Sequence, residues 1–151
     1  METMENSSGL HALGAVLRDL NRDLLRAGRR AAAVEPLPES EADIVRLVVR
    51  EPGVSPGQIA AELRMKPSNV SAGLRRLAEA GLVERVSDPA DRRAARVLPT
   101  PLAVRNALLL ERARAGLLEE ALDTLPAAHR DALLRAIPAL RALDTALRDR
   151  V

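Results

Sequence analysis

The spacing of the leucines near the start of the chain predicts one long amphipathic helix. They recur at alternating three- and four-residue steps, at Leu10, Leu13, Leu17, Leu20 and Leu24. Steps of this length line up the side chains as a narrow apolar seam, which is buried only when another helix packs against it. The prolines within residues 35–39 are expected to end the helix, because proline disfavours helical backbone at its own position and at the residue before it.

Two shorter helices are predicted next. The first begins at Ser40, with Asp43 three residues later, and its apolar positions continue to the Glu-Pro-Gly at 51–53. The second begins at Ser55, where serine, proline and glutamine occupy the positions of an N-cap, a first helical residue and a capping box. A short turn at 64–66 separates it from the helix that follows.

The next helix is predicted from Pro67 to Ala80. Its core-facing positions, spaced by three or four residues, are Val70, Leu74 and Leu77. Gly81 is expected to end it in the left-handed conformation that other residues adopt rarely. Beyond this glycine the hydrophobic period shortens to about two residues. Residues 82–86 and 95–98 are therefore expected to form two short strands, joined by the polar loop 87–94.

Two further helices are expected in the last third of the chain. Thr100-Pro101 predicts the start of one that runs to about residue 125, and a second extends from there to the C-terminus. The apolar stripe of the last helix needs a partner and includes Leu133, Ile137, Leu140 and Leu147. The predicted fold class is mainly α with a small β-hairpin, an α+β arrangement.

Helix, tight turn, helix and then hairpin is the order of a winged helix-turn-helix, in which the second helix of the pair enters the major groove of DNA. On helix 67–80, the predicted DNA-contacting positions are Ser68, Asn69, Ser71, Ala72, Arg75 and Arg76. Asparagine can pair with adenine, and arginine with guanine or phosphate. Four residues outside this helix complete the helix-turn-helix and strand positions predicted to contact DNA, namely Ser55, Gln58, Lys66 and Arg96. The alternative is an ordinary solvated helix face.

The location of the charges, and not the net charge, supports DNA binding over an ordinary solvated helix face. The formal net charge is only +2, but residues 64–96 hold eight basic side chains against four acidic ones. Lys66 is the only lysine among 23 basic residues, and arginine suits bidentate contacts with phosphate and guanine. A GC-rich genome would produce the same preference for arginine. Since Phe, Tyr and Trp are absent, the core must be built from aliphatic residues.

Composition also argues against several classes of function. Without cysteine, disulfides, thiolate metal sites and thiol switches are impossible. Only His11 and His129 remain as imidazole ligands, so we expect no metal and no cofactor. Neither a glycine-rich phosphate loop nor a catalytic triad pattern is evident, which argues against an enzyme. No apolar run reaches 18 residues, and the acidic, serine-rich start does not resemble a signal peptide, so a cytoplasmic protein without membrane contact is expected.

The sequence resembles the MarR family over roughly residues 10–147. The resemblance is carried by residues 55–63, 67–71 and 77–85, and most specifically by Asp-Pro-Ala-Asp-Arg-Arg at 88–93. It implies that Arg93 enters the minor groove at the wing tip, that Asp91 holds it by a salt bridge and that Arg92 contacts phosphate. Lys66 stands where the family usually has a capping serine or asparagine.

The resemblance also implies a homodimer formed by the terminal helices. Residues 1–34 and 101–151 are expected to be its dimerisation regions and 40–100 its DNA-binding lobe, within one continuous compact unit. The predicted interface comprises Leu10, Leu13, Leu17, Leu20, Leu24, Leu133, Ile137, Leu140 and Leu147. The expected function is a repressor that binds a pseudo-palindromic operator, and the resemblance leaves open a response to a small apolar effector. The alternative is a winged-helix module for protein contacts or non-specific chromosome binding.

Overall fold

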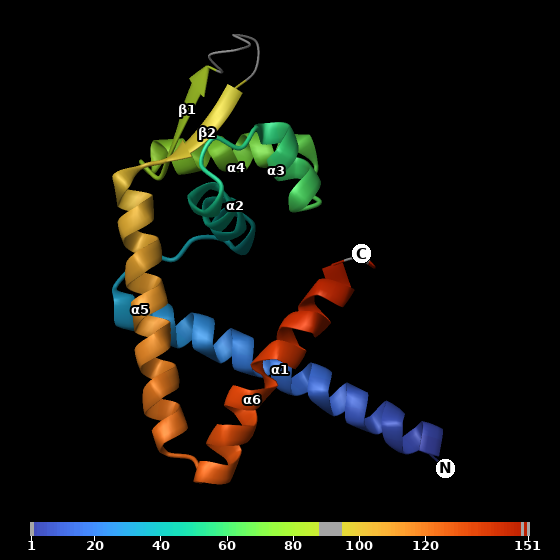
Figure 1. Ribbon diagram of the computed structural model, residues 1–151. Coiled ribbons are helices and arrows are strands. Elements are labelled where there is room, and N and C mark those ends of the chain that lie inside the picture. Colours follow the sequence, from blue (N-terminus) through green and yellow to red (C-terminus); the bar gives the residue numbers. More distant parts are fainter. Residues whose placement is uncertain (1, 88–94, 149, 151) are drawn as a thin grey trace.

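The computed structural model describes residues 2–87, 95–148 and 150 of the chain. These residues form six helices and one two-stranded antiparallel sheet, so the predicted α+β class with a small hairpin is confirmed. A compact lobe containing the sheet lies at one end of the molecule, and three long helices extend away from it (Figure 1).

The long helices come from the two ends of the sequence. They are α1 (Glu2–Ala32), α5 (Pro101–Asp123) and α6 (Ala127–Arg148). α1 packs mainly against α5, and the two helices approach closely where Gly28 faces Arg114. A Cβ atom at Gly28 would lie only 2.6 Å from Cγ of Arg114. The predicted single helix before the prolines is therefore confirmed, and its packing partner within the chain is α5.

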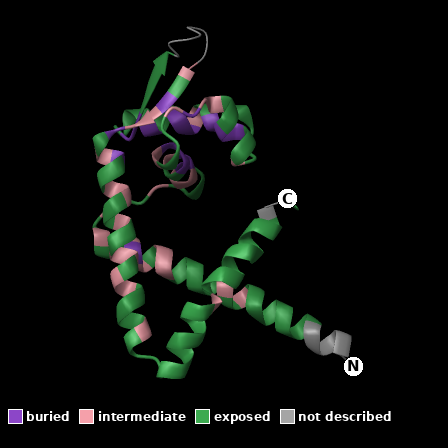
Figure 2. Cartoon of the chain, viewed as in Figure 1, coloured by how far each residue is buried: buried purple, intermediate pink, exposed green. Residues whose placement is uncertain are grey.

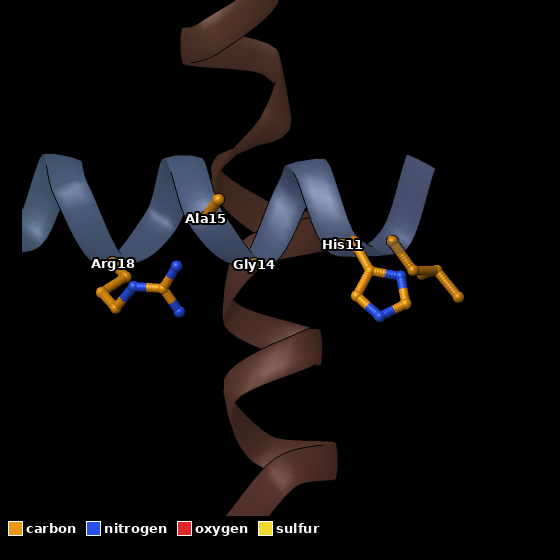
Figure 3. Close-up of a pocket in the computed structure, with 5 residues that line it drawn as sticks. His11, Gly14, Ala15 and Arg18 are labelled. Carbon is orange, nitrogen blue, oxygen red and sulfur yellow. The ribbon is translucent and has the colours of Figure 1, made fainter. Parts of the chain in front are cut away.

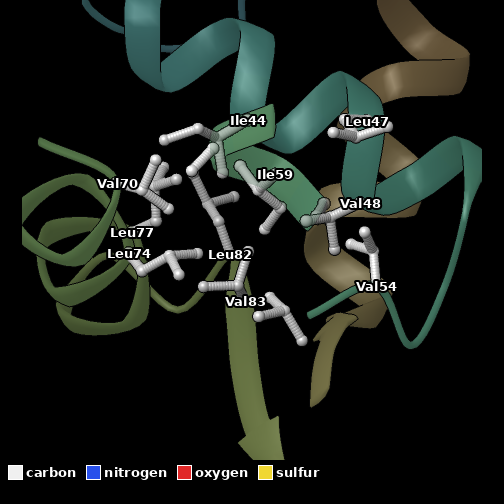
Figure 4. Close-up of a cluster of buried hydrophobic side chains, with 13 residues drawn as sticks. Ile44, Leu47, Val48, Val54, Ile59, Val70, Leu74, Leu77, Leu82 and Val83 are labelled. Atoms are coloured by element: carbon white, nitrogen blue, oxygen red, sulfur yellow. The ribbon is translucent and has the colours of Figure 1, made fainter. Parts of the chain in front are cut away.

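The lobe is built from three helices and the hairpin. They are α2 (Glu39–Arg50), α3 (Pro56–Glu62), α4 (Pro67–Glu79), β1 (Val83–Ser87) and β2 (Ala95–Pro99). Its core consists of aliphatic side chains that converge from all five elements (Figure 4). Val70, Leu74 and Leu77 are fully buried, as the periodicity predicts. Each such side chain contributes about 1.5–3 kcal/mol through removal of apolar surface from water.

The start of α2 differs from the prediction of an N-cap at Ser40. The helix begins at Glu39, and the cap position is Pro38, with no side-chain capping hydrogen bond. The carbonyl oxygen of Pro38 accepts hydrogen bonds from the backbone N–H groups of Glu41 and Ala42, at 3.0 and 2.9 Å. Because proline already holds φ at −51°, the chain enters the helix one residue before the serine.

The hairpin is tied to the helices on both sides. β1 and β2 pair with Val83 opposite Pro99 and Arg85 opposite Val97, and Val54 forms an additional bridge to Val97. At the end of β2 the Thr100 hydroxyl donates to the Gly81 carbonyl oxygen at 2.7 Å and accepts from the Ala103 N–H at 3.2 Å. Thr100 therefore caps α5, as predicted, and also joins it to the end of α4.

Burial is concentrated in the lobe, whereas the long helices are mostly exposed within a single chain (Figure 2). α6 in particular buries none of the side chains that the structure describes. Apolar helices that remain exposed in one chain usually mark a surface for association.

Candidate nucleic-acid interface

Local hydrogen bonds form at the start of α3 and in the turn between α3 and α4. At the start of α3, Ser55 Oγ accepts from the Gln58 N–H at 3.2 Å, and Gln58 Oε1 accepts from the Ser55 N–H at 2.9 Å. This is the predicted capping box. At the other end, Arg64 adopts φ +51°, and the Met65 N–H donates to the Ala60 carbonyl at 3.0 Å. The resulting tight turn is typical of a helix-turn-helix.

α4 has a buried face and a polar face. Val70, Gly73, Leu74 and Leu77 face the core. The residues predicted to contact DNA lie outside this buried face: Ser68, Asn69, Ser71, Arg75 and Arg76 are exposed, and Ala72 is half-buried. The hydrophobic spacing therefore predicts correctly which side of α4 faces outward. Short polar side chains on such a surface can approach base edges closely.

Lys66 and Pro67 form the N-terminal end of α4. Lys66 is the cap residue, is exposed, and makes no side-chain capping hydrogen bond. Backbone N–H groups in a helical first turn have no intrahelical acceptors, and they favour anionic groups such as phosphate. The ammonium group of Lys66 adds a positive charge at the same place. This arrangement suits contact with the DNA backbone.

The structure gives Ser55 and Gln58 a definite local role. Their side-chain oxygens hold the start of α3 through the capping box, and Gln58 is exposed while Ser55 is half-buried. A contact between either side chain and DNA stays a prediction.

Arg76 forms an ion pair that the sequence spacing did not indicate. Its Nε atom lies 2.5 Å from Oε1 of Glu41 on α2, and the Glu41 side chain is only 7% exposed. One turn earlier on α4, a Cβ at Gly73 would lie 2.9 Å from Cδ1 of Ile44. Two features of the sequence could have indicated this contact. Glu41 lies on the same helical face as Ile44, and a glycine inside a helical pattern, such as Gly73, often marks a close approach of another segment.

The wing is described in part. Arg96 is exposed on β2, where its side chain lies near Gly53, which adopts φ +92°. Asp91, Arg92 and Arg93 lie outside the described residues, so their predicted roles at the wing tip stay predictions. The lobe nevertheless places β1 beside α4, with β2 paired to β1, which is the arrangement that a winged helix requires (Figure 1).

The residues predicted for a dimer interface lie on the long helices. Those exposed in the single chain are Leu10, Leu13, Leu20, Leu133, Ile137, Leu140 and Leu147, whereas Leu17 and Leu24 are half-buried. α1 and α6 meet at a shallow hollow of about 270 Å³, which Leu17 lines together with Leu140 and Leu147. Part of the predicted α1 and α6 surfaces therefore face each other within one chain.

A second hollow lies farther along α1, with a volume of about 360 Å³. It is lined by Leu10, His11, Gly14, Ala15 and Arg18, all from one helix (Figure 3). His11 Nδ1 lies 2.6 Å from the Ser7 carbonyl oxygen, so this side chain is engaged with its own helix.

The other candidate chemistries find no support in the described part of the chain. Within it, no three His, Cys, Asp or Glu side chains are grouped so as to bind a metal ion. None of its helices has the length and apolar character needed to span a bilayer. The polar face of α4 and the adjacent hairpin have the arrangement of a winged helix-turn-helix protein.

Comparison with known proteins identifies the family. A model of the MarR family matches residues 36–94. A candidate transcriptional regulator protein from Pseudomonas aeruginosa is 32% identical, with a TM-score of 0.72, and the match covers 88% of this chain and 94% of that one. The chain belongs to the MarR family of transcriptional regulators, which are not enzymes.

Two more distant structures share the fold. A MarR family protein from Bacillus stearothermophilus is 18% identical, with a TM-score of 0.74 and coverage of 92% of this chain and 97% of that one. FabT from Streptococcus pneumoniae, solved in complex with DNA, is also 18% identical, with a TM-score of 0.70 and coverage of 91% and 98%. No curated protein matches the chain significantly in sequence.

Proposed function

We propose that the chain acts as a cytoplasmic homodimer that represses transcription by binding a pseudo-palindromic operator through α4 and the wing. The observation that carries this proposal is the two-sided character of α4. Its apolar face is fully buried in the lobe, while Ser68, Asn69 and Arg75 are exposed together on the rest of the helix. FabT, which has the same fold, binds DNA.

The positions proposed for DNA contact fall into two groups. Asn69, Arg75 and the short side chains on α4 would face base edges, where they provide sequence specificity. Lys66, Arg92 and Arg96 would contact phosphates, and Arg93, positioned by Asp91, would enter the minor groove. Phosphate contacts set affinity and its dependence on salt, but they carry no direct sequence information.

The homodimer is proposed from the exposure of the long helices. Leu10, Leu20 and Leu147 are each more than half exposed in the single chain, at 63%, 54% and 54%. A two-fold axis through these helices would present two copies of α4 to the same duplex. Adjacent major grooves on one side of DNA are separated by about 34–36 Å, so each half-site would bind one lobe.

Selection of bound duplexes from a random pool tests target type, symmetry and spacing together. We expect recovery of one inverted-repeat sequence, and we expect Asn69→Ala to weaken selection at a single position of each half-site. Recovery of many unrelated sequences would instead support non-specific chromosome binding. Absence of binding to any duplex by folded protein at moderate ionic strength would leave protein contact as the function of the winged helix.

Regulation by a small apolar effector is a further part of the proposal. An effector that binds between the lobe and the long helices would change the spacing of the two α4 helices and so reduce operator affinity. A compound screen in which operator affinity never shifts would contradict this regulation.

A further inference from the structure

Among the described residues, Glu41 is the only buried acidic side chain. It lies beside α4, the helix proposed to read DNA. A carboxylate removed from water is costly unless an oppositely charged donor compensates it. Arg76 supplies that donor, with Nε 2.5 Å from Oε1 of Glu41. Hydrogen bonds in which both partners are charged are stronger and more directional than neutral ones.

The ion pair is one of two contacts between α2 and α4 that are one helical turn apart. In the first, Ile44 of α2 packs against the backbone of α4 at Gly73, so closely that a Cβ would come within 2.9 Å. In the second, Glu41 pairs with Arg76. The apolar contact limits the distance between the helices, and the charged contact resists rotation of α4 about its own axis. Both contacts therefore constrain the side of α4 that faces α2.

Arg75 is exposed like its neighbour, but unlike Arg76 it forms no ion pair with any described residue. At about 100° per residue, Arg76 lies on the flank of α4 next to Gly73, whereas Arg75 lies nearly opposite the buried face. Adjacent arginines on one helix therefore have different surroundings, although the sequence alone presents them as equivalent.

We propose that Arg76 is a positioning residue and not a reader of DNA, and that its ion pair with Glu41 sets the rotation of α4 so that Asn69 and Arg75 meet the bases. This inference rests on the proposed function. It predicts that Glu41, which lies away from the DNA-facing surface, contributes to sequence discrimination. It also predicts that Glu41 and Arg76 contribute as one unit.

The test measures affinity for two duplexes over a range of KCl concentrations, using the full chain. One duplex is the sequence recovered by selection with the wild-type protein, and the other is the same composition in scrambled order. Glu41→Gln and Arg76→Gln should each lower the ratio of the two affinities about tenfold, and the double variant should lower it no further. Affinity for the scrambled duplex, and the slope of log affinity against log salt, should stay at the wild-type values.

Arg75→Gln is the matched control, because it removes a neighbouring arginine that has no partner on α2. Its effect should add to that of Glu41→Gln, as for independent sites. Circular dichroism must show each variant fully folded at the assay temperature. If Glu41→Gln does not fold, Glu41→Asp replaces it, because that change keeps the charge and withdraws it from Arg76 by one methylene group.

Three results separate the possible failures. A wild-type affinity ratio for folded Glu41→Gln, or for Glu41→Asp in its place, overturns the positioning role. A salt slope reduced by about 1 in Arg76→Gln shows that Arg76 contacts phosphate directly, and also overturns it. If the wild-type protein itself does not discriminate between the two duplexes, the proposed function fails first, and the positioning role of Arg76 fails with it.

Discussion

Gly73 allows α2 and α4 to approach closely, and replacing it with alanine tests how tight that contact is. The added methyl group would lie 2.9 Å from Cδ1 of Ile44 and 3.8 Å from Cγ of Glu41. Ile44 is fully buried, so its side chain cannot move into open space. Overpacking of this kind typically costs about 1–3 kcal/mol. Alanine also favours the helix over glycine by about 1 kcal/mol, which offsets part of the cost.

Gly116 provides the matched control. It lies inside α5, and a Cβ built on it meets nothing within 4 Å. Gly116→Ala should therefore stabilise the fold by up to about 1 kcal/mol, through helix propensity alone. Since this propensity gain is common to both variants, the difference between their free energies of unfolding isolates the packing cost. We expect Gly73→Ala to be less stable than Gly116→Ala by about 1–3 kcal/mol.

Urea unfolding followed by circular dichroism measures this difference. All variants must be compared at one protein concentration, because the stability of a dimer depends on concentration. Equal stability of Gly73→Ala and Gly116→Ala would refute the reasoning, since it would mean that the α2–α4 contact holds space for a methyl group. A loss of operator discrimination in folded Gly73→Ala would additionally show that the spacing between these helices matters for DNA reading.

Three further predictions concern the dimer, the wing and the junction of the lobe with α5. Leu20→Asp should yield monomers that bind the operator poorly, because a charge in an apolar helix contact is costly. Analytical ultracentrifugation checks this, and a stable dimer would place the interface elsewhere. Arg93→Ala should weaken operator binding by roughly 1–3 kcal/mol in a gel-shift titration without lowering Tm, and unchanged affinity would remove Arg93 from the site. Thr100→Val should destabilise the fold by about 1–3 kcal/mol in urea, since it leaves the Gly81 carbonyl and the Ala103 N–H without their shared partner; wild-type stability would show that water replaces the hydroxyl.

Much of the lobe follows from local patterns. The capping box at Ser55, the left-handed Gly81 at φ +70° and the start of α5 at Pro101 agree with their predictions. The hairpin strands lie at the predicted positions to within about one residue. The error at the start of α2 has a local cause as well, since Pro38 supplies the capping carbonyl before Ser40 is reached.

Other parts of the site depend on contacts between distant segments, which local sequence patterns do not predict. The additional bridge of Val54 to Val97 joins segments more than 40 residues apart, and it is not evident from either segment alone. Arg64 adopts φ +51° in the turn between α3 and α4, a left-handed conformation that residues other than glycine adopt rarely. The backbone of α4 is therefore placed by both the preceding turn and the sheet beyond it.

By itself, the order of residues determined where helices and strands lie along the chain, which face of each is apolar, and that α4 presents a polar surface. These features depend on neighbours within a few positions, through side-chain periodicity and capping hydrogen bonds. Only the tertiary structure decided that Arg76 faces Glu41, 35 positions earlier in the chain, and that Arg75 does not. The reason is that the engagement of a charged side chain depends on which helix packs beside it, and that packing is a property of the whole lobe.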